Sequence, residues 1–558
     1  MRQRQDKKAQ PAPKPSPAAA PGWLRPTLLG LTAVLLLTWL TGEIADTDIW
    51  LHLMTGRHTL QHHALTVPDP FSYTSNITSA AYPGEVKTRY FNLTHEWLAQ
   101  MVMYLIHAAS GFSGLVLVRA VLLIVFCGLV GLMVWWRTAG FYRSLAAAIA
   151  AGAVAINFQQ SRPFLITFLF LAVTMAVLER RRWMWALPAV FLLWANCHGG
   201  YFMGWVMLGA YCLEALVRRQ SWPEQRQLWF VSAACFLISG VNPNGFRVIE
   251  IMLKYRSSGI QSTNIEWQYP AFWEPSGYSF VLFGALVMLA ISWRRTRPVD
   301  WILYFVFGAA SLLAVRNTIL MGLVGAVLMF VYLPLWKRAL PVAAEMGAAA
   351  ALAAAIGFGL VGGHAFQLRA AEWMLPSGAA DFLKAHRVTG RMFNTYENGG
   401  YLVWRLWPMQ KDFIDPRGLS EQAYVDYGHI LNNDPTPGQS APEVLRKYGI
   451  EVLVMGGFDR FSGQVFNIAA ALADPGQKEW KLVQFDDKGV VFMREPPPGV
   501  PVLNSLEALH SIEIQCQQQV ERDPAHTGCL NGVTALYNTI GDRGLASRWM
   551  SYYTGRGR

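Results

Sequence analysis

The fold is decided by residues 113–136, which read SGLVLVRAVLLIVFCGLVGLMVWW. A run of about 20 mostly apolar residues can cross the hydrocarbon core of a bilayer as a helix. A similar run extends from Pro26 to Thr41, and others follow along the chain. Of the 558 residues, 53% are hydrophobic and only 15% are charged, whereas soluble domains carry about 25% charged residues. The composition excludes an ordinary soluble enzyme and predicts an α-helical polytopic membrane protein.

About eleven apolar stretches are candidates for membrane spans. We place them near residues 23–42, 113–136, 144–158, 163–179, 184–197, 200–217, 227–241, 277–293, 301–315, 319–336 and 342–363. The stretch 184–197 contains Pro188, and its length of about 14 residues also suits an interfacial segment. We retain it because its loss would reverse every later loop. The short apolar stretch from Trp97 to His107 is expected to be an amphipathic helix on the outer membrane surface.

The basic residues orient these spans. With the N-terminus inside, the inward segments carry 18 Lys and Arg residues, whereas the longer outward segments before the last span carry 8. The positive-inside rule therefore predicts a cytoplasmic N-terminus and an outer C-terminus. The first apolar run is too long for a signal-peptide core of about 7 to 15 residues, so we keep it as a span. The net charge of +11 is dispersed in short clusters, and we expect no nucleic-acid partner.

The composition changes after the last span. Strand-like runs appear at 391–394, 411–415, 450–455, 480–485 and 490–494, with helical stretches between them. We predict a cytoplasmic basic tail (1–22), a transmembrane domain (23–363) whose first periplasmic loop is 43–112, a periplasmic α/β domain (364–500) and a helical C-terminal tail (501–558). Cys516 and Cys529 fall in this tail, and an oxidising compartment would let them form a disulfide.

Polar residues beside the spans gather on the predicted outer face. They include Asp46, Asp48, His95, Glu96, Arg162, His198, Arg247, Glu266 and Arg316. Any one of them can be a solvated helix end. Together they indicate a functional site, because ionisable groups at membrane depth are costly and the inward loops show no comparable mixture of acids, amides and His.

The arrangement resembles the GT-C superfamily of membrane glycosyltransferases. Asp46-Thr47-Asp48 follows the first span and matches the first-loop DxD signature of that superfamily. More narrowly, Asp46 to Leu53, Asp69-Pro70-Phe71-Ser72 and His95-Glu96-Trp97-Leu98 resemble an uncharacterised bacterial multipass group. Many GT-C transferases have a His-Pro-Pro-Leu-like segment where this chain has His95 to Leu98. The resemblance implies a polyprenyl-phosphate-linked sugar donor, with an acidic first-loop residue acting as base or metal ligand.

The chemistry of transfer assigns roles to these residues. An acceptor needs a carboxylate to take its proton, and a departing lipid phosphate needs fixed positive charge. We predict Asp48, Asp46 and Glu96 as catalytic residues. We predict substrate-binding roles for His95, Arg162, His198, Arg247, Glu266 and Arg316. A divalent cation, Mg or Mn, could be held by Asp46 and Asp48 together with Glu96, since carboxylate oxygens suit these ions.

The predicted function is transfer of a sugar from a polyprenyl-phosphate donor to a glycan, lipid or protein acceptor at the periplasmic face of a bacterial inner membrane. One alternative is a transporter or flippase, which would require charges buried within spans and broken helices in two corresponding halves. Neither feature is evident in the sequence. Another alternative is a non-catalytic envelope assembly protein whose α/β domain does the binding.

Overall fold

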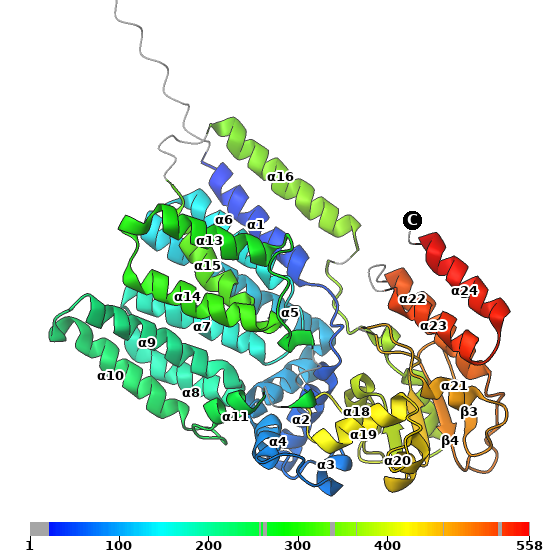
Figure 1. The fold of residues 1–558 in the computed structure, drawn as a ribbon. Helices are drawn as coiled ribbons and strands as arrows, with labels where there is room; N and C mark the ends of the chain where they lie inside the picture. The colour runs from blue at the N-terminus through cyan, green and yellow to red at the C-terminus, as the bar shows by residue number, and fades with distance from the viewer. Residues whose placement is uncertain are drawn as a thin grey trace, which may run out of the picture.

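The computed structural model describes residues 22–255, 258–260, 265–334, 341–363, 365–460, 462–522 and 527–556. The predicted basic tail at 1–22 lies outside these residues except for Gly22, and so do Lys337 and Arg338 of the last predicted inward loop. The chain forms a large bundle of helices and a smaller C-terminal part that contains a sheet (Figure 1). The helices of the first long loop lie between these two parts (Figure 1).

Each predicted span coincides with a helix. These helices are α1 (Leu24–Leu40), α5 (Trp97–Thr138), α6 (Phe141–Ala155), α7 (Phe164–Arg180), η1 (Met184–Ala186) with α8 (Leu187–Cys197), η2 (Gly199–Tyr201) with α9 (Phe202–Val217), α10 (Trp222–Ser239), α13 (Gly277–Ile291), α14 (Pro298–Leu313), α15 (Ile319–Tyr332) and α16 (Val342–Val361). A break at Gly111, with φ 64° and ψ −158°, divides α5. The segment that begins at Trp97 is thereby separated from the apolar run 113–136.

Several helices have the character of membrane spans. Four are long and apolar enough by length and composition: Glu85–Thr138, Gly199–Val217, Val315–Tyr332 and Val342–Val361. Five shorter apolar helices accompany them: Leu24–Leu40, Phe141–Ala155, Met184–Cys197, Gly277–Ile291 and Pro298–Leu313. Apolar side chains on the outside of the bundle are strongly exposed, including Phe358 at 83% and Val361 at 89%. The protein is therefore a multi-pass membrane protein, while the number of eleven spans and their orientation stay predictions.

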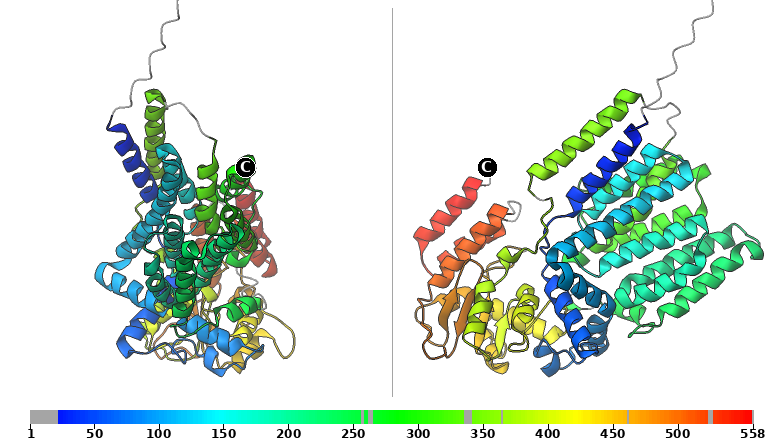
Figure 2. Two further views of the ribbon diagram at one scale, coloured as in Figure 1. Left: turned by 90° about the vertical axis from the view of Figure 1, so that its left-hand side faces the viewer. Right: turned by 180° about the vertical axis from the view of Figure 1, so that it is seen from behind.

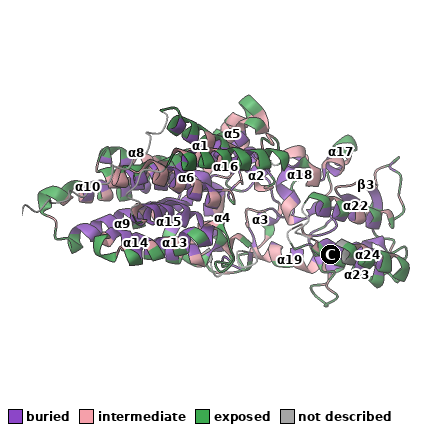
Figure 3. Cartoon of the chain, turned by 90° about the horizontal axis from the view of Figure 1, so that it is seen from above, coloured by how far each residue is buried: buried purple, intermediate pink, exposed green. Residues whose placement is uncertain are grey.

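The bundle is built around α15. Nearly all of its side chains are buried, whereas α16 lies at the edge alongside α1 with most of its surface exposed (Figures 2 and 3). A Cβ at Gly325 would lie 2.8 Å from Cγ1 of Val281 on α13. A small residue is needed there because α13 and α15 approach closely, as membrane helices do at glycine contacts.

The first long loop forms α2 (Asp48–His62), α3 (Thr74–Ile77) and α4 (Glu85–Thr94). It docks on the C-terminal part through Arg417, whose Nη1 lies 2.8 Å from Oδ1 of Asp69. The Nη2 atom of Arg417 lies 2.5 Å from Oδ2 of Asp415. Both carboxylates are buried, so one guanidinium joins two segments that are distant in the sequence.

The C-terminal part contains one mixed sheet with strand order β1-β2-β4-β3. Its strands are β1 (Met392–Asn394), β2 (Val452–Met455), β3 (Lys481–Phe485) and β4 (Val490–Met493). β1 runs parallel to β2, whereas β4 is antiparallel to both β2 and β3. The predicted strand at 411–415 is wrong: that segment makes a single bridge, between Asp412 and Ser72 of the first loop. The backbone of Asp412 forms hydrogen bonds with Phe71 and Tyr73 of the first loop, so these groups are not free to pair with a strand of the sheet.

Helices surround the sheet and end the chain. They are η7 (Tyr396–Asn398), α17 (Ser377–Ala385), α18 (Gly399–Leu406), α19 (Glu421–Leu431), α20 (Ala441–Lys447), α21 (Ile468–Ala473), α22 (Glu507–Arg522), α23 (Gly528–Thr539) and α24 (Arg543–Arg556). A disulfide between Cys516 and Cys529 joins α22 to α23, which confirms the predicted pair.

Candidate functional site

Arg162 brings three of the predicted acids together. It lies in the loop between α6 and α7. Its Nε and Nη2 atoms each lie 2.6 Å from an oxygen of Asp46. Its Nη1 atom lies 3.0 Å from Oδ2 of Asp48 and 3.2 Å from Oε1 of Glu266. Glu266 belongs to η3 (Ile265–Trp267), so three distant loops meet at one guanidinium.

The local backbone explains why both aspartates reach Arg162. Asp48 is the first residue of α2, where a negative side chain is favoured by the helix dipole. The Oδ1 atom of Asp46 accepts a hydrogen bond from the backbone N–H of Asp48 at 3.3 Å. The sequence Asp46-Thr47-Asp48 is thus a helix start whose two carboxylates meet the same cation.

The charges of this cluster do not balance, because three acids share one guanidinium. Burial raises the pKa of Asp48 to about 8, and the Asp46, Glu266 and Glu96 charges add to the rise against the opposing effect of Arg162. Burial also acts to raise the pKa of Asp46, but the two contacts with Arg162 outweigh it and leave that pKa below its usual value. At neutral pH, Asp46 is therefore a carboxylate, whereas Asp48 exchanges a proton near that pH.

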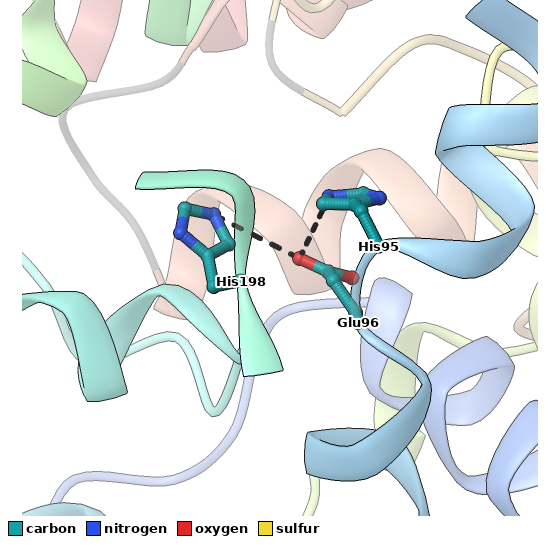
Figure 4. Close-up of side chains that lie close together, drawn as sticks. All are labelled: His95, Glu96 and His198. Atoms are coloured by element: carbon teal, nitrogen blue, oxygen red, sulfur yellow. Dashed lines mark ion pairs between the residues drawn. The ribbon is translucent and has the colours of Figure 1, made fainter. Parts of the chain in front are cut away.

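A second cluster forms around Glu96 (Figure 4). Its Oε1 atom lies 3.4 Å from Nε2 of His95 and 3.8 Å from Nε2 of His198. The ligand atoms of these three residues lie within 4.8 Å of one another, a spacing that could hold a metal ion. His52 lies one helical turn after Asp48 on α2, and its Nδ1 atom is 3.6 Å from Oε2 of Glu96. His52 therefore connects the Arg162 cluster to the Glu96 cluster.

Hydrogen bonds fix the proton positions on these imidazoles. His95 donates through Nδ1 to the carbonyl of Phe91 at 2.8 Å, which leaves Nε2 for Glu96. The Nδ1 atom of His198 accepts from the backbone N–H of Gly200 at 3.0 Å. Burial lowers the pKa of His198 to about 3, so the neutral ring carries its proton on Nε2, which lies 3.8 Å from Oε1 of Glu96. The Nε2 atoms of His95 and His198 thus face Glu96 at ion-pair distances of 3.4 and 3.8 Å.

A Mg or Mn site at Asp46 and Asp48 stays a prediction. In this structure both oxygens of Asp46 are bonded to Arg162, so a cation bound there would have to displace these two contacts. Within the described ranges, Glu96 joins His95 and His198 rather than the two aspartates. The three acids predicted to share a cation therefore belong to two neighbouring clusters.

A narrow cavity of about 40 Å³ lies beside the Glu96 cluster. Its walls are mostly apolar: Phe158, Phe164, Phe168, Met203, Ile319 and Leu320. Thr167, His198, Arg316 and Asn317 supply its polar atoms. The guanidinium of Arg316 stacks over the ring of Trp267 at 4.8 Å, and Trp267 directly follows Glu266. The cavity therefore combines an apolar wall with a cation next to the carboxylates.

Arg247 is the predicted site residue that the fold leaves outside these clusters. It precedes α11 (Val248–Tyr255), and its side chain is exposed. No ion pair links it to Asp46, Asp48 or Glu96 in the part of the chain that the structure describes.

Arg119 is a site residue that the sequence reasoning missed. It lies within α5 and is only 1% exposed. It donates hydrogen bonds to the carbonyls of Gln159 and Gly42. Arg119 thereby ties the exit of α1 to the loop that carries Arg162. A single Arg inside the apolar run 113–136 was the available signal, because such a charge persists only with partners.

The C-terminal part also reaches the site. Burial raises the pKa of Tyr396 well above its usual value, and the charges of Asp48 and Asp415 raise it further. The backbone N–H of Tyr396 donates to the hydroxyl of Tyr427 at 3.1 Å. A buried tyrosine of the C-terminal part thus lies within electrostatic range of Asp48.

Comparisons with known proteins show the fold alone. No protein-family model matches the chain, and no curated protein matches it in sequence. The apo crystal structure of the Archaeoglobus fulgidus oligosaccharyltransferase is similar, with a TM-score of 0.52, 11% identity, and coverage of 86% of this chain and 75% of that chain. The structure of oligosaccharyltransferase AglB from the same organism in complex with an inhibitory peptide and a dolichol-phosphate has a TM-score of 0.52 with the same identity and coverage. The structure of the enzyme tethered to an acceptor peptide has a TM-score of 0.51, again with the same identity and coverage. The chain therefore shares the fold of this oligosaccharyltransferase over most of its length, which agrees with the fold that the sequence resemblance implied.

Proposed function

We propose that this protein transfers a sugar from a polyprenyl-phosphate-linked donor to an envelope acceptor at the periplasmic face of a bacterial inner membrane. One observation carries the proposal: the Arg162 cluster of carboxylates adjoins an apolar cavity that contains Arg316 and His198. This combination suits a ligand with a hydrocarbon chain, an anionic phosphate and a reacting carbon beside a base. AglB, which shares the fold, has been solved with a dolichol-phosphate.

The cavity of about 40 Å³ must widen to admit the donor, whose isoprenoid chain then lies against Phe164, Phe168 and Leu320. The phosphate of the donor contacts the guanidinium of Arg316 and the Nε2–H of His198. Burial in an apolar wall strengthens these charge-assisted hydrogen bonds. Thr167 and the backbone N–H of Gly200 hold the ring of His198 in place through Nδ1, which leaves Nε2–H for the phosphate.

Asp48 accepts the proton of the acceptor. As the acceptor attacks the anomeric carbon, the bond from that carbon to the phosphate oxygen breaks, and the lipid phosphate leaves with the bonding electrons. Arg316 stabilises the charge that develops on the phosphate. Arg162 keeps Asp46 and Asp48 in position, and no step requires a metal at Asp46. Tyr396 and the C-terminal part form the acceptor side of the site.

The test uses purified protein in lipid vesicles with radiolabelled polyprenyl-phosphate sugars and envelope fractions as acceptors. The expected result is sugar transfer with release of lipid phosphate, and a strongly raised KM for the donor in Arg316→Ala. A flippase would move the labelled lipid across the bilayer with its sugar still attached. That outcome, or no release with any donor, would contradict the proposal.

A further inference from the structure

A second cavity lies at the opposite end of the bundle from Arg162, where α7 and α9 end and α10 and α14 begin. Its volume is about 530 Å³, within the range of about 300 to 1,000 Å³ that is typical of small-molecule sites. Four arginines line it: Arg181, Arg218, Arg219 and Arg297. The sugar-transfer site uses none of these residues.

Some of the charged groups in this cavity already have partners. Arg297 contacts both oxygens of Glu179, at 2.6 and 3.1 Å. Tyr211 donates to the same carboxylate at 2.6 Å. Glu224 accepts from the backbone N–H of Ser221 at 2.9 Å and caps α10. These groups stabilise the fold and have little capacity left for a ligand.

Glu214 lacks such partners. It lines the cavity, is only 4% exposed, and its Oε1 atom has no hydrogen bond to any described residue. The nearest cation is Nη1 of Arg218 at 3.7 Å, which is longer than a hydrogen bond. A buried carboxylate oxygen without a donor costs free energy. A protonated amine supplies both the missing N–H donors and the opposite charge.

The rim of the cavity has the opposite character. Arg218 is 52% exposed at its side chain. Among the residues that the structure describes, Arg181 makes only a long hydrogen bond of 3.4 Å, to the carbonyl of Glu224. With Arg219 these guanidiniums are placed to bind an anion, and phosphate is one of the two groups whose geometry matches the guanidinium fork. The cavity therefore has a buried acid in its wall and basic groups at its rim, and this arrangement is complementary to a zwitterion.

Tryptophans place this end of the bundle at the lipid headgroups. Trp183, Trp185, Trp222 and Trp293 lie at the same ends of the helices, and they are 77%, 61%, 56% and 62% exposed. Exposed tryptophans of membrane proteins concentrate at the interface between hydrocarbon and water. A ligand of this cavity can therefore come directly from the bilayer.

We propose that this cavity binds the phosphoethanolamine headgroup of a phospholipid. The ammonium group contacts Glu214, and the phosphate contacts Arg181, Arg218 and Arg219. The membrane supplies the ligand, and the site is separate from sugar transfer.

Thermal unfolding of the full-length protein in detergent tests this proposal, with added phosphatidylethanolamine, phosphatidylcholine or phosphatidylglycerol of the same acyl chains. We expect phosphatidylethanolamine to raise the Tm at concentrations about tenfold below those needed for the other two lipids. Phosphatidylcholine lacks N–H donors for Glu214, and phosphatidylglycerol lacks the cation. Equal protection by phosphatidylglycerol or phosphatidylcholine would overturn the proposal, and this comparison needs only the wild-type protein.

Variants test which residue of the cavity causes the preference for phosphatidylethanolamine. Glu214→Gln should lose the preference for phosphatidylethanolamine over phosphatidylcholine. Glu224→Gln is the matched control: it lies in the same cavity, keeps the cap of α10, and should retain the preference. Free phosphoethanolamine should protect far less than the lipid at equal concentration. A preference that survives Glu214→Gln would remove Glu214 from the site, and equal protection by free phosphoethanolamine would reject the lipid as its source.

Discussion

Replacement of Asp48 by Asn tests the assignment of the base. The Asn side chain keeps the shape of Asp48 and can still accept a hydrogen bond from Nη1 of Arg162, which lies 3.0 Å from Oδ2 of Asp48. It cannot accept a proton from the acceptor. Loss of a general base lowers rates by about 10² to 10⁴-fold, so we expect a fall of that size in kcat without unfolding.

The pKa of Asp48 sets the pH dependence of the wild-type protein. With a pKa of about 8, about one site in ten carries the carboxylate at pH 7, and about nine in ten carry it at pH 9. If this carboxylate is the base, kcat/KM should rise about tenfold between these pH values. The residual activity of Asp48→Asn should lack this rise.

The same pKa predicts the sign of an effect on stability. The folded protein binds the proton of Asp48 more tightly than the unfolded chain, since burial raises this pKa from 3.8 to about 8. The resulting stabilisation is complete below about pH 4 and is lost as the pH rises towards 8. Asp48→Asn cannot lose a proton, so its Tm at pH 8 should equal or exceed that of the wild type.

The assay is transfer of label from the lipid-linked sugar in vesicles, with pH profiles and thermal unfolding of the same preparations. Glu43→Gln is the matched control, because Glu43 contacts Arg369 at 3.2 Å and Trp373 at 3.2 Å rather than Arg162. Full activity in both Asp48→Asn and Asp46→Asn, together with loss in Glu96→Gln, would refute the assignment. The base would then belong to the Glu96 cluster.

Three further predictions concern the frame around the site. Arg417→Ala leaves Asp69 and Asp415 buried without their cation, and breaking such pairs costs about 3 to 5 kcal/mol; limited proteolysis should cut the first loop faster, and unchanged resistance would argue against docking through Arg417. Reporter fusions at Arg181 and Arg295 should read cytoplasmic and one at Asp415 periplasmic, and a cytoplasmic signal at Asp415 would reverse the orientation. Reduction of the Cys516–Cys529 disulfide should destabilise the C-terminal helices by about 3 kcal/mol; thiol labelling of the unfolded, unreduced protein should leave these two cysteines unmodified, and their labelling would show that the bond is absent.

The sequence predicted the helices well because apolar runs of this length have few alternatives. Most of the residues that it singled out also lie together in the Arg162 and Glu96 clusters, since acids and histidines at span ends are unusual; their roles stay predictions. The sequence could not predict that Arg162 pairs with Asp46, which is 116 residues away, because contacts between loops depend on how the helices pack. His52 lies in the quoted segment Asp46 to Leu53 but was given no role, although it follows Asp48 by four residues, the spacing that places two side chains on one face of a helix.

At the opposite end of the bundle, the sequence did not indicate that charged residues form a network. Asp300 is fully buried there and contacts Arg137 at 3.0 Å and Arg297 at 2.8 Å. In the sequence each of these residues resembles an ordinary solvated helix end. Only the packing of α5 against α14 and α15 shows that they form a network.

The proposed function requires a lipid phosphate to bind between Arg316 and His198, beside the Arg162 cluster. A structure of the protein with a bound polyprenyl phosphate tests this requirement. We expect phosphate oxygens within hydrogen-bonding distance of both side chains and the isoprenoid chain against Phe164 and Leu320. A phosphate bound away from Arg316, with the chain outside this cavity, would rule out the proposed donor site.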